Sequence, residues 1–371
     1  MTAPLEGILV LDFSTLLPGP MATLMLAEAG AEVVKIERPG GEEMRRYVPK
    51  WGRESVNFAM LNRGKKSLVL DLKREADKAR LRPLLERADV LVEQFRPGVM
   101  ARLGLDPETV RKINPGIVYC SITGFGQSGP KRDMAAHDLN YIGETGVLSL
   151  SMGPGDRPVV PPVLMADIAA GSYPAVLNIL LALRERDRTG EGSTLDIAMA
   201  DNLFPFMFWA IGNAQAAGLW PENGGDLVTG GSPRYRLYPT ADGKVLAAAP
   251  LEQQFWDAFA ETIGLPEEWR DDSVDPEGTA AAAAALIAAR PAAYWEERVR
   301  GVDCCCSIVR TLEEALADPH FRERGLFVER LANEAGEEMP ALPMPIDRAF
   351  RAGLGEARRA PALGEDAPGG E

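Results

Sequence analysis

The sequence predicts an α/β protein, with a large Rossmann-like domain on a parallel sheet and a smaller α+β domain. Three observations lead to this fold class. Short apolar runs alternate with helical patterns over the first 125 residues, which is typical of βαβ units with helices on both faces. The pattern changes near Gly224, where a hairpin and several helices follow. The chain has 371 residues, whereas a single core stops growing near roughly 250–300 residues.

The elements of the large domain follow one another in a regular order. Apolar runs bounded by turn residues predict the strands Gly7–Phe13, Glu32–Glu37, Ser67–Leu72, Asp89–Phe95 and Gly116–Thr123. A helix is expected after Pro18, which suits a first helical turn. A charged helix is expected over Lys73–Arg87, and another opens at Pro97.

The second half of the chain has a different texture. Residues 165–220 hold two Ala-rich apolar helices that flank Gly192–Asp196, and Tyr235–Pro250 predicts a hairpin around Ala241-Asp-Gly-Lys. Helices follow at Glu252–Thr262, Thr279–Arg290 and Ala292–Arg300, and the Gly-, Ala- and Pro-rich tail from Gly355 is expected to be mobile. We therefore expect a large domain at 1–190, linker helices at 191–225, a small domain at 226–310 and a returning segment at 311–371.

Composition limits the partners. With 40 Lys+Arg and 54 Asp+Glu, the net charge of −14 argues against nucleic acid or an anionic membrane as the main partner. Val159–Leu183 approaches membrane-spanning length, but Asp167 within it favours a buried helix. Four cysteines, three of them contiguous at 304–306, form no disulfide framework or metal site, so we expect buried thiols and a reducing, cytoplasmic location.

A glycine pattern follows the predicted strand Gly116–Thr123. Gly124-Phe-Gly-Gln-Ser-Gly129 matches G-x-G-x-x-G, the fingerprint of dinucleotide binding, and keeps a nicotinamide-dependent oxidoreductase as one hypothesis. The fingerprint requires a helix that opens inside the motif, whereas Pro130-Lys-Arg-Asp comes next. A glycine turn that lets the backbone pass close to a neighbour is the favoured interpretation.

Three residues are candidates for proton chemistry. His137 is one of only two histidines, a residue type suited to general acid–base work, while His320 is expected on the surface. Asp167 is the only acid between Asp156 and Glu185, and either a helix cap or a catalytic carboxylate fits its small neighbours. Glu252 either opens a helix or takes part in the site.

Basic residues lie next to three predicted strands of the large domain. Arg38 and Arg96 come directly after strands, and the loop Asn62–Lys66 adds a third basic segment. Loops at the carboxyl ends of parallel strands are where open α/β sheets bind ligands. This pattern predicts a site for a phosphorylated molecule.

Long motifs resemble the family III CoA-transferase superfamily, and within it the α-methylacyl-CoA racemases. They include LDFSTLLPGPMATLMLAEAGAEVVKIERPGG at 11–41, LNRGKKSLVLDL at 61–72, ADVLVEQFRPGVMARLGL at 88–105, SITGFGQSGP at 121–130, TGGSPRYRLYPTADGK at 229–244 and CSIVRTLEEALADPHFRERG at 306–325. The resemblance implies an interlocked homodimer with the substrate site between one subunit's large domain and the other's small domain.

The resemblance also implies roles for individual residues. Segment AHDLNY is similar to the racemases' GHDxNY, with Ala136 in place of glycine, and His137 would pair with Asp167 while Glu252 comes from the partner subunit. No cofactor beyond the CoA of the substrate and no metal are implied. The implied CoA-binding residues are Arg38, Asn62, Arg63, Ala88, Asp89, Val90, Arg96, Ala136, Asp138, Asn140 and Tyr141.

The chemistry that follows from the resemblance is inversion at the α-carbon of a 2-methylacyl-CoA. One residue removes a proton from one face of the carbon and the other delivers a proton to the opposite face, with backbone N–H groups near Asp167 holding the enolate oxygen. The alternative is a CoA transferase with Asp167 as nucleophile. Transferases of this superfamily usually lack a histidine at the position of His137. The presence of His137, Asp167 and Glu252 favours the racemase.

Overall fold

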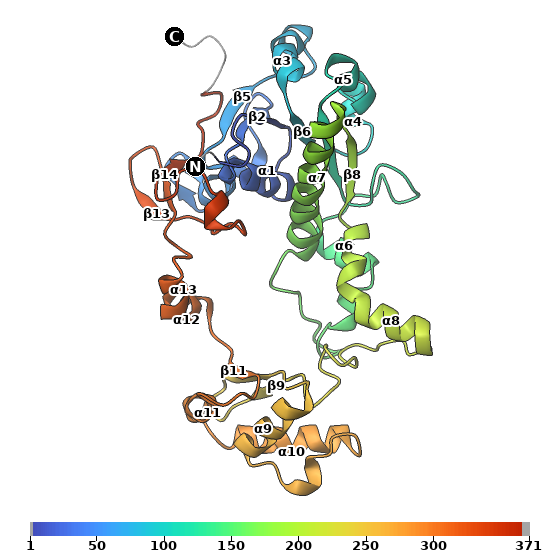
Figure 1. Ribbon diagram of the computed structural model, residues 1–371, viewed down its shortest axis with the longest axis vertical. Coiled ribbons are helices and arrows are strands. Elements are labelled where there is room, and N and C mark those ends of the chain that lie inside the picture. The colour runs from blue at the N-terminus through green and yellow to red at the C-terminus, as the bar shows by residue number, and fades with distance from the viewer. Residues whose placement is uncertain (1–2, 366–371) are drawn as a thin grey trace. The chain divides into compact units, whose positions relative to one another are not determined.

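Residues 3–365 are described by the computed structural model, and they fall into two units (Figure 1). The first unit holds the chain up to Thr145, Pro162–Pro205 and the segment from Arg322 onward. The second holds Gly146–Pro161 and Phe206–Phe321. The domain boundaries expected at 190, 225 and 310 stay predictions.

The first unit is built on a six-stranded parallel sheet with the strand order β5-β2-β1-β6-β7-β8. Every neighbouring pair in it is parallel, which confirms the predicted parallel α/β sheet. The order reverses at β1, and a crevice forms beyond the carboxyl ends of strands at such a point. The strands are β1 (Leu9–Asp12), β2 (Glu32–Glu37), β5 (Lys66–Val69), β6 (Val90–Glu93), β7 (Val118–Thr123) and β8 (Thr194–Ala198).

Helices cover both faces of this sheet. On one face α3 (Glu75–Arg87), α4 (Val99–Leu103) and α5 (Pro107–Ile113) bury Leu81, Met100 and Val110 against strand residues such as Leu11 and Tyr119. On the other face lie α1 (Pro18–Glu28), whose residues are all buried, and α7 (Tyr173–Thr189). A helix buried all round needs no amphipathic pattern, which explains the uniformly apolar sequence of α1.

One long helical run precedes β8. A π-helix over Met165–Ser172 continues directly into α7, and among residues 3–365 this run, Met165–Thr189, is the one helix long and apolar enough to cross a membrane. Only 44% of its most apolar window is buried. Leu177, Leu180 and Leu181 are exposed on it. The expectation of a buried helix is therefore correct for one side of the run only.

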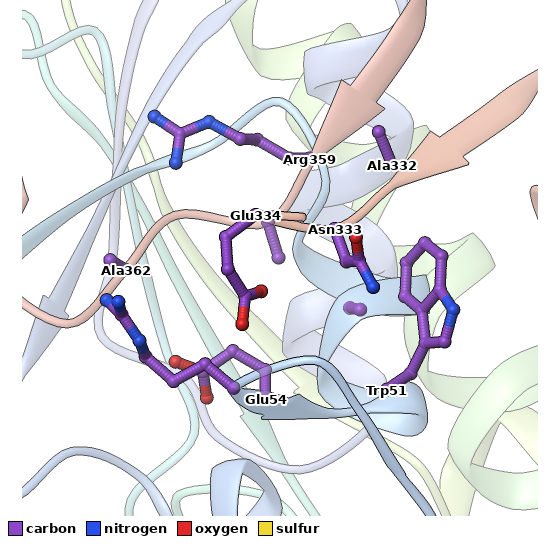
Figure 2. Close-up of a pocket in the computed structure, with 10 residues that line it drawn as sticks. Trp51, Glu54, Ala332, Asn333, Glu334, Arg359 and Ala362 are labelled. Carbon is purple, nitrogen blue, oxygen red and sulfur yellow. The ribbon is translucent and has the colours of Figure 1, made fainter. Parts of the chain in front are cut away.

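The returning chain adds a small mixed sheet to the first unit. Strands β12 (Arg330–Ala332), β13 (Glu338–Pro340) and β14 (Ala357–Arg359) pair side by side. Part of the tail expected to be mobile from Gly355 is therefore a strand, and the part beyond residue 365 lies outside the described residues. Figure 2 shows the pocket between this sheet and the hairpin β3 (Lys50–Trp51)–β4 (Glu54–Ser55). Helix α2 (Val56–Asn62) follows β4 and adds Ala59 to the lining. At about 40 Å³ the pocket has room for little more than water.

The second unit is an antiparallel sheet covered by helices. The sheet has the order β11-β10-β9, and the hairpin of β9 (Arg236–Pro239) and β10 (Val245–Ala248) confirms the predicted turn around Asp242 and Gly243. Trp256, Phe259 and Trp295 fill its core. The remaining elements are β11 (Cys306–Ile308), α8 (Phe208–Ala217), α9 (Gln253–Ile263), α10 (Pro276–Ala288), α11 (Ala292–Val299) and α12 (Leu312–Ala317), and α13 (Pro319–Glu323) leads back to the first unit.

The cysteine triplet differs from expectation in part. Cys304 is buried, but Cys305 is exposed and Cys306 is half-buried. The backbone of Cys305 is left-handed, which turns the flanking side chains toward each other. The Sγ atoms of Cys304 and Cys306 lie 3.0 Å apart.

Candidate active site

A cavity of about 440 Å³ lies in the first unit, beyond the carboxyl ends of the central strands. Its walls come from the segments that follow β1, β6, β7 and β8, together with α6 (Asp138–Glu144) and the π-helix. This is the place where an open parallel sheet binds its ligand. The lining residues are Thr15, Leu16, Pro18, Gln94, Phe95, Arg96, Pro97, Ile122, Thr123, Gly124, Phe125, Arg132, Met134, Ala135, Ala136, His137, Asn140, Tyr141, Asp167 and Met199.

The glycine turn forms one wall of this cavity. A Cβ on residue 124 would lie 2.3 Å from the ring of Tyr141, so only glycine fits there. Gly126 has a φ of +82°, and the next N–H, that of Gln127, donates to Asp196 at 2.9 Å. The helix after the turn, α6, begins only at Asp138. The dinucleotide fingerprint therefore lacks its helix, and the interpretation as a close-packed turn is the one that the geometry supports.

His137 sits at the start of α6 and lines the cavity. Its backbone N–H donates to the side-chain oxygen of Asn140 at 3.0 Å. The hydroxyl of Tyr141 donates to the carbonyl of Ala136 at 2.8 Å. These two bonds fix the backbone on both sides of the histidine, while its side chain stays exposed to the cavity.

Asp167 lines the same cavity from the π-helix. Burial and, next, the carboxylate of Asp138 raise its pKa to about 6, against the lowering effect of His137. A carboxyl group with such a pKa exchanges protons readily near neutral pH.

The surroundings of Asp167 correct two expectations. It is the third residue of its helix and not the cap, which is Leu164. Its own N–H donates to Oδ1 of Asp138 at 2.9 Å, so this group is not free to hold an enolate oxygen. The small neighbours serve packing, since Ala166 and Ala170 are fully buried and a Cβ at Gly171 would lie 3.0 Å from Sδ of Met199.

Glu252 belongs to the second unit. It is exposed and immediately precedes α9, with an extended backbone and no side-chain hydrogen bond to the helix. His137 and Asp167 belong to the first unit. A role for Glu252 beside them stays a prediction.

Two arginines expected to bind phosphate differ in their position. Arg96 follows β6 and lines the cavity, with its side chain exposed. Arg38 follows β2 and is exposed as well, with its Nε donating to the carbonyl of Gly41 at 3.2 Å. Both lie beyond the carboxyl ends of their strands, as the sequence predicts.

Asn62 and Arg63 are enclosed by protein. Arg63 is 1% exposed, and it donates to Glu28 at 2.9 Å and to the carbonyl of Leu342 at 2.8 Å. Asn62 is fully buried between the carbonyl of Phe58 and the ammonium group of Lys65. Their side chains thus join α1, α2 and the returning segment, and neither lines the cavity.

Ala88, Asp89 and Val90 lie at the amino end of β6, whereas Arg96 follows its carboxyl end. Asp89 pairs with Arg186 at 2.8 Å and accepts the N–H of Leu9 at 2.7 Å. Ala88 and Val90 are buried. The structure therefore does not bring this segment to the edge of the sheet that holds Arg96. By contrast, it brings Ala136, Asn140 and Tyr141 into the cavity wall and Asp138 against Asp167.

Several cavity residues were not predicted from the sequence. Arg132 follows the glycine turn in a run of charged residues, and this basic position was the one available signal. Thr15, Leu16 and Gln94 follow β1 and β6, where a rule on strand ends would have included them. Over residues 3–365, no group of three or more His, Cys, Asp or Glu side chains is arranged to hold a metal ion.

Comparisons with known proteins give a consistent result. The sequence pattern of CoA-transferase family III matches residues 5–367. The chain is 37% identical over 366 residues to alpha-methylacyl-CoA racemase from Mus musculus, covering 97% of this chain and 91% of that protein. It is 32% identical over 353 residues to acetyl-CoA:oxalate CoA-transferase from Acetobacter aceti, covering 92% and 89%. Racemases and transferases are thus nearly equally similar.

Solved structures share the fold over almost the whole chain. Rv3272 from M. tuberculosis has a TM-score of 0.83 at 27% identity, covering 98% of this chain and 97% of that one. A CAIB/BAIF family protein from Brucella suis has a TM-score of 0.79 at 29% identity, with the same coverage.

Proposed function

The chain belongs to CoA-transferase family III, and within that family we propose that it is an isomerase interconverting R- and S-2-methylacyl-CoA thioesters. The observation that carries the proposal is the presence of His137 and Asp167 in one cavity, with the pKa of Asp167 raised to about 6. A carboxyl group whose pKa is raised toward neutrality can pass a proton to and from an imidazole in the same cavity. Inversion at a carbon acid requires such a pair.

The reaction has two proton transfers. A thioester carbonyl acidifies the adjacent C–H, so a positioned base can remove the proton and leave an enolate. For the S form, neutral His137 accepts this proton, and protonated Asp167 delivers its proton to the opposite face of the carbon. The R form reacts in reverse, with ionised Asp167 as the base.

Glu252 is proposed to orient His137 from the partner subunit of a homodimer. Apolar side chains left exposed in each unit support an extensive interface. In the first unit these include Leu177 and Leu181, and in the second Phe208 and Trp220, with exposed fractions of 58–79%. A monomeric soluble protein rarely exposes so many large apolar groups.

We also propose that the protein is located in the cytoplasm.

The second candidate function is a CoA transferase. Asp167 lines the cavity and offers a carboxylate nucleophile, and transferases such as that of A. aceti are 32% identical to this chain. In that reaction the carboxylate would form a mixed anhydride and then an enzyme thioester. The histidine beside Asp167 has no evident role in such chemistry, which favours the isomerase.

The test supplies one enantiomer of a 2-methylacyl-CoA and follows its configuration with and without an added carboxylic acid. With an isomerase, the 2-methylacyl-CoA loses optical purity at the same rate with and without the added acid. A transferase moves CoA to the added acid, leaves the configuration unchanged, and yields an Asp167 adduct that hydroxylamine or borohydride traps.

CoA binding gives a first quantitative prediction. Arg96 and Arg132 line the cavity and Arg38 lies beyond β2, and we propose that they hold the phosphates of CoA. Arg96→Ala is expected to weaken CoA binding by about 1.5–3 kcal/mol, the range for hydrogen bonds to charged groups. Titration calorimetry with free CoA measures it. Lys112→Ala, which removes an exposed cation on α5, is the control, and equal affinities of the two variants would place the phosphates elsewhere.

The pH dependence gives a second prediction. The charge of Asp138 raises the pKa of Asp167, so its removal in Asp138→Asn lowers that pKa while an amide oxygen still accepts the N–H of Asp167. Because His137 and Asp167 share one proton, the plot of kcat/KM against pH is bell-shaped for each direction of the reaction, and its two limbs belong to the pair of groups. The limb of the profile that follows Asp167 should move to lower pH in the variant. An unmoved or oppositely moved profile would contradict the assigned electrostatic role.

A further inference from the structure

The loop between β1 and α1 supplies one wall of the cavity in a strained conformation. Thr15, Leu16 and Pro18 line the cavity. Leu16 has a φ of +61°, and in the described part of the chain only Cys305 shares a left-handed backbone among non-glycine residues. A leucine keeps such a backbone only where its surroundings hold it there, and such strain gathers at ligand sites.

A buried glutamate from outside the cavity holds this residue. Oε2 of Glu42 accepts the N–H of Leu16 at 2.8 Å, and Glu42 itself is 3% exposed. It comes from the segment after β2, 26 positions along the chain, and does not line the cavity. A carboxylate buried in this way is costly unless it is paired.

The pairing partner of Glu42 holds the same loop at a second point. Nζ of Lys35 lies 3.3 Å from Oε1 of Glu42 and donates to the carbonyl of Ser14 at 2.8 Å. The N–H of Ser14 donates to Asp12 at 2.9 Å. Glu42, Lys35 and Asp12 are all almost completely buried. Three charged side chains therefore hold the backbone of Ser14 and Leu16.

The far end of the loop is also tied to the cavity wall. The N–H of Gly19 donates to the side chain of Gln94 at 2.9 Å, and Gln94 itself lines the cavity. A Cβ at Gly19 would lie 2.1 Å from Cβ of Ser14, so the loop folds tightly onto the start of α1. The loop is thus held at both ends, and Glu42 is the group that holds Leu16.

We propose that Glu42 is a positioning residue for substrate binding, which acts by holding Leu16 in its left-handed conformation and so shapes the cavity wall. The proposal rests on the proposed function only in taking the ligand of the cavity to be an acyl-CoA. Without the carboxylate, Leu16 relaxes to a negative φ and the wall at Thr15 and Leu16 moves. The effect falls on affinity more than on turnover, since Glu42 touches no reacting atom.

The test uses a pair of double variants that differ only in backbone freedom. Glu42→Ala is expected to raise KM and the Kd for acyl-CoA on the order of tenfold, as for the loss of one charge-assisted bond, with a smaller change in kcat. The double variant Glu42→Ala/Leu16→Gly should bind acyl-CoA nearly as tightly as Leu16→Gly alone, because glycine adopts a positive φ without strain. The double variant Glu42→Ala/Leu16→Ala also lacks the leucine side chain but keeps a Cβ, so it should bind acyl-CoA more weakly than Leu16→Ala alone.

Two further variants separate positioning from general stabilisation. Glu42→Gln keeps an acceptor for the N–H of Leu16, so it should keep most of the affinity even where its Tm falls. Glu43→Ala, at the exposed neighbouring position, should leave KM unchanged. Equal KM values for the two double variants, or an unchanged KM in Glu42→Ala, would overturn the proposal.

A readout without ligand keeps the proposal independent of the reaction. Amide hydrogen exchange at residues 13–17 should speed up in Glu42→Ala and stay close to wild type in Glu42→Gln. Unchanged protection of Leu16 in Glu42→Ala would refute the anchoring role even if no racemisation occurred. If the wild-type protein showed no racemisation while amide exchange in the Glu42 variants followed the expected pattern, only the proposed reaction would be refuted.

Discussion

Replacing His137 with alanine is expected to lower the rate of racemisation by about 10²–10⁴-fold in both directions, the usual contribution of a positioned acid or base. The loss is symmetrical because each inversion needs one group on either face of the α-carbon. Asp167 remains, and it should still exchange the α-proton of the R form with solvent without inverting the centre. Chiral analysis of the product, together with NMR of the α-position in deuterated water, measures both rates.

A matched control is available for this variant. His320, the other histidine, is exposed on α13 in the second unit, and His320→Ala should retain wild-type activity. A His137→Ala protein that keeps most of the wild-type turnover would contradict the isomerase and favour the transferase, in which the histidine has no assigned step.

Asp167→Asn is expected to cause a loss of similar size, about 10²–10⁴-fold, because an amide neither accepts nor donates the proton of a carbon acid. Here His137 remains, so α-proton exchange should persist for the S form and vanish for the R form. This pattern mirrors that of His137→Ala. Asp187→Asn, at an exposed position on α7, is the control.

The two variants together distinguish the candidate functions. In a transferase Asp167→Asn would also be inactive, since it removes the nucleophile, so this variant alone decides little. The complementary exchange of the two enantiomers is specific to a two-base mechanism. If Asp167→Asn exchanged both enantiomers at equal rates, a single base would serve both faces, and the assignment of one residue to each face would be wrong.

The sequence predicts the parallel sheet well because its central strands hold short apolar runs between turn residues. Glu32–Glu37 was predicted with the same bounds that β2 has. The edge strand β8 was missed because Thr194–Ala198 begins with three residues that are exposed or half-buried and follows the long helix α7. The strand β14 was missed in a tail of strand-breaking composition, where pairing with β12 outweighs local preference.

The candidate site was partly predictable for a related reason. His137 and Asp167 stand out by residue type, and Arg96 by its place after a strand, and all three line one cavity. Arg63 looked like a phosphate ligand because it lies in a basic loop, but its partner Glu28 is 35 positions away. Such pairing depends on packing between distant segments. The anchor from Glu42 to Leu16 is hidden from sequence for the same reason.

Incorporation of deuterium at the α-carbon by the wild-type enzyme tests the central claim most directly. One enantiomer of a 2-methylacyl-CoA is incubated in deuterated water without any acceptor acid, and mass and configuration are followed in the same samples. We expect one deuterium to enter the α-position as the optical purity falls, with both approaching completion together. An enzyme that binds the thioester, as shown by calorimetry, yet leaves the α-hydrogen unexchanged would contradict the account.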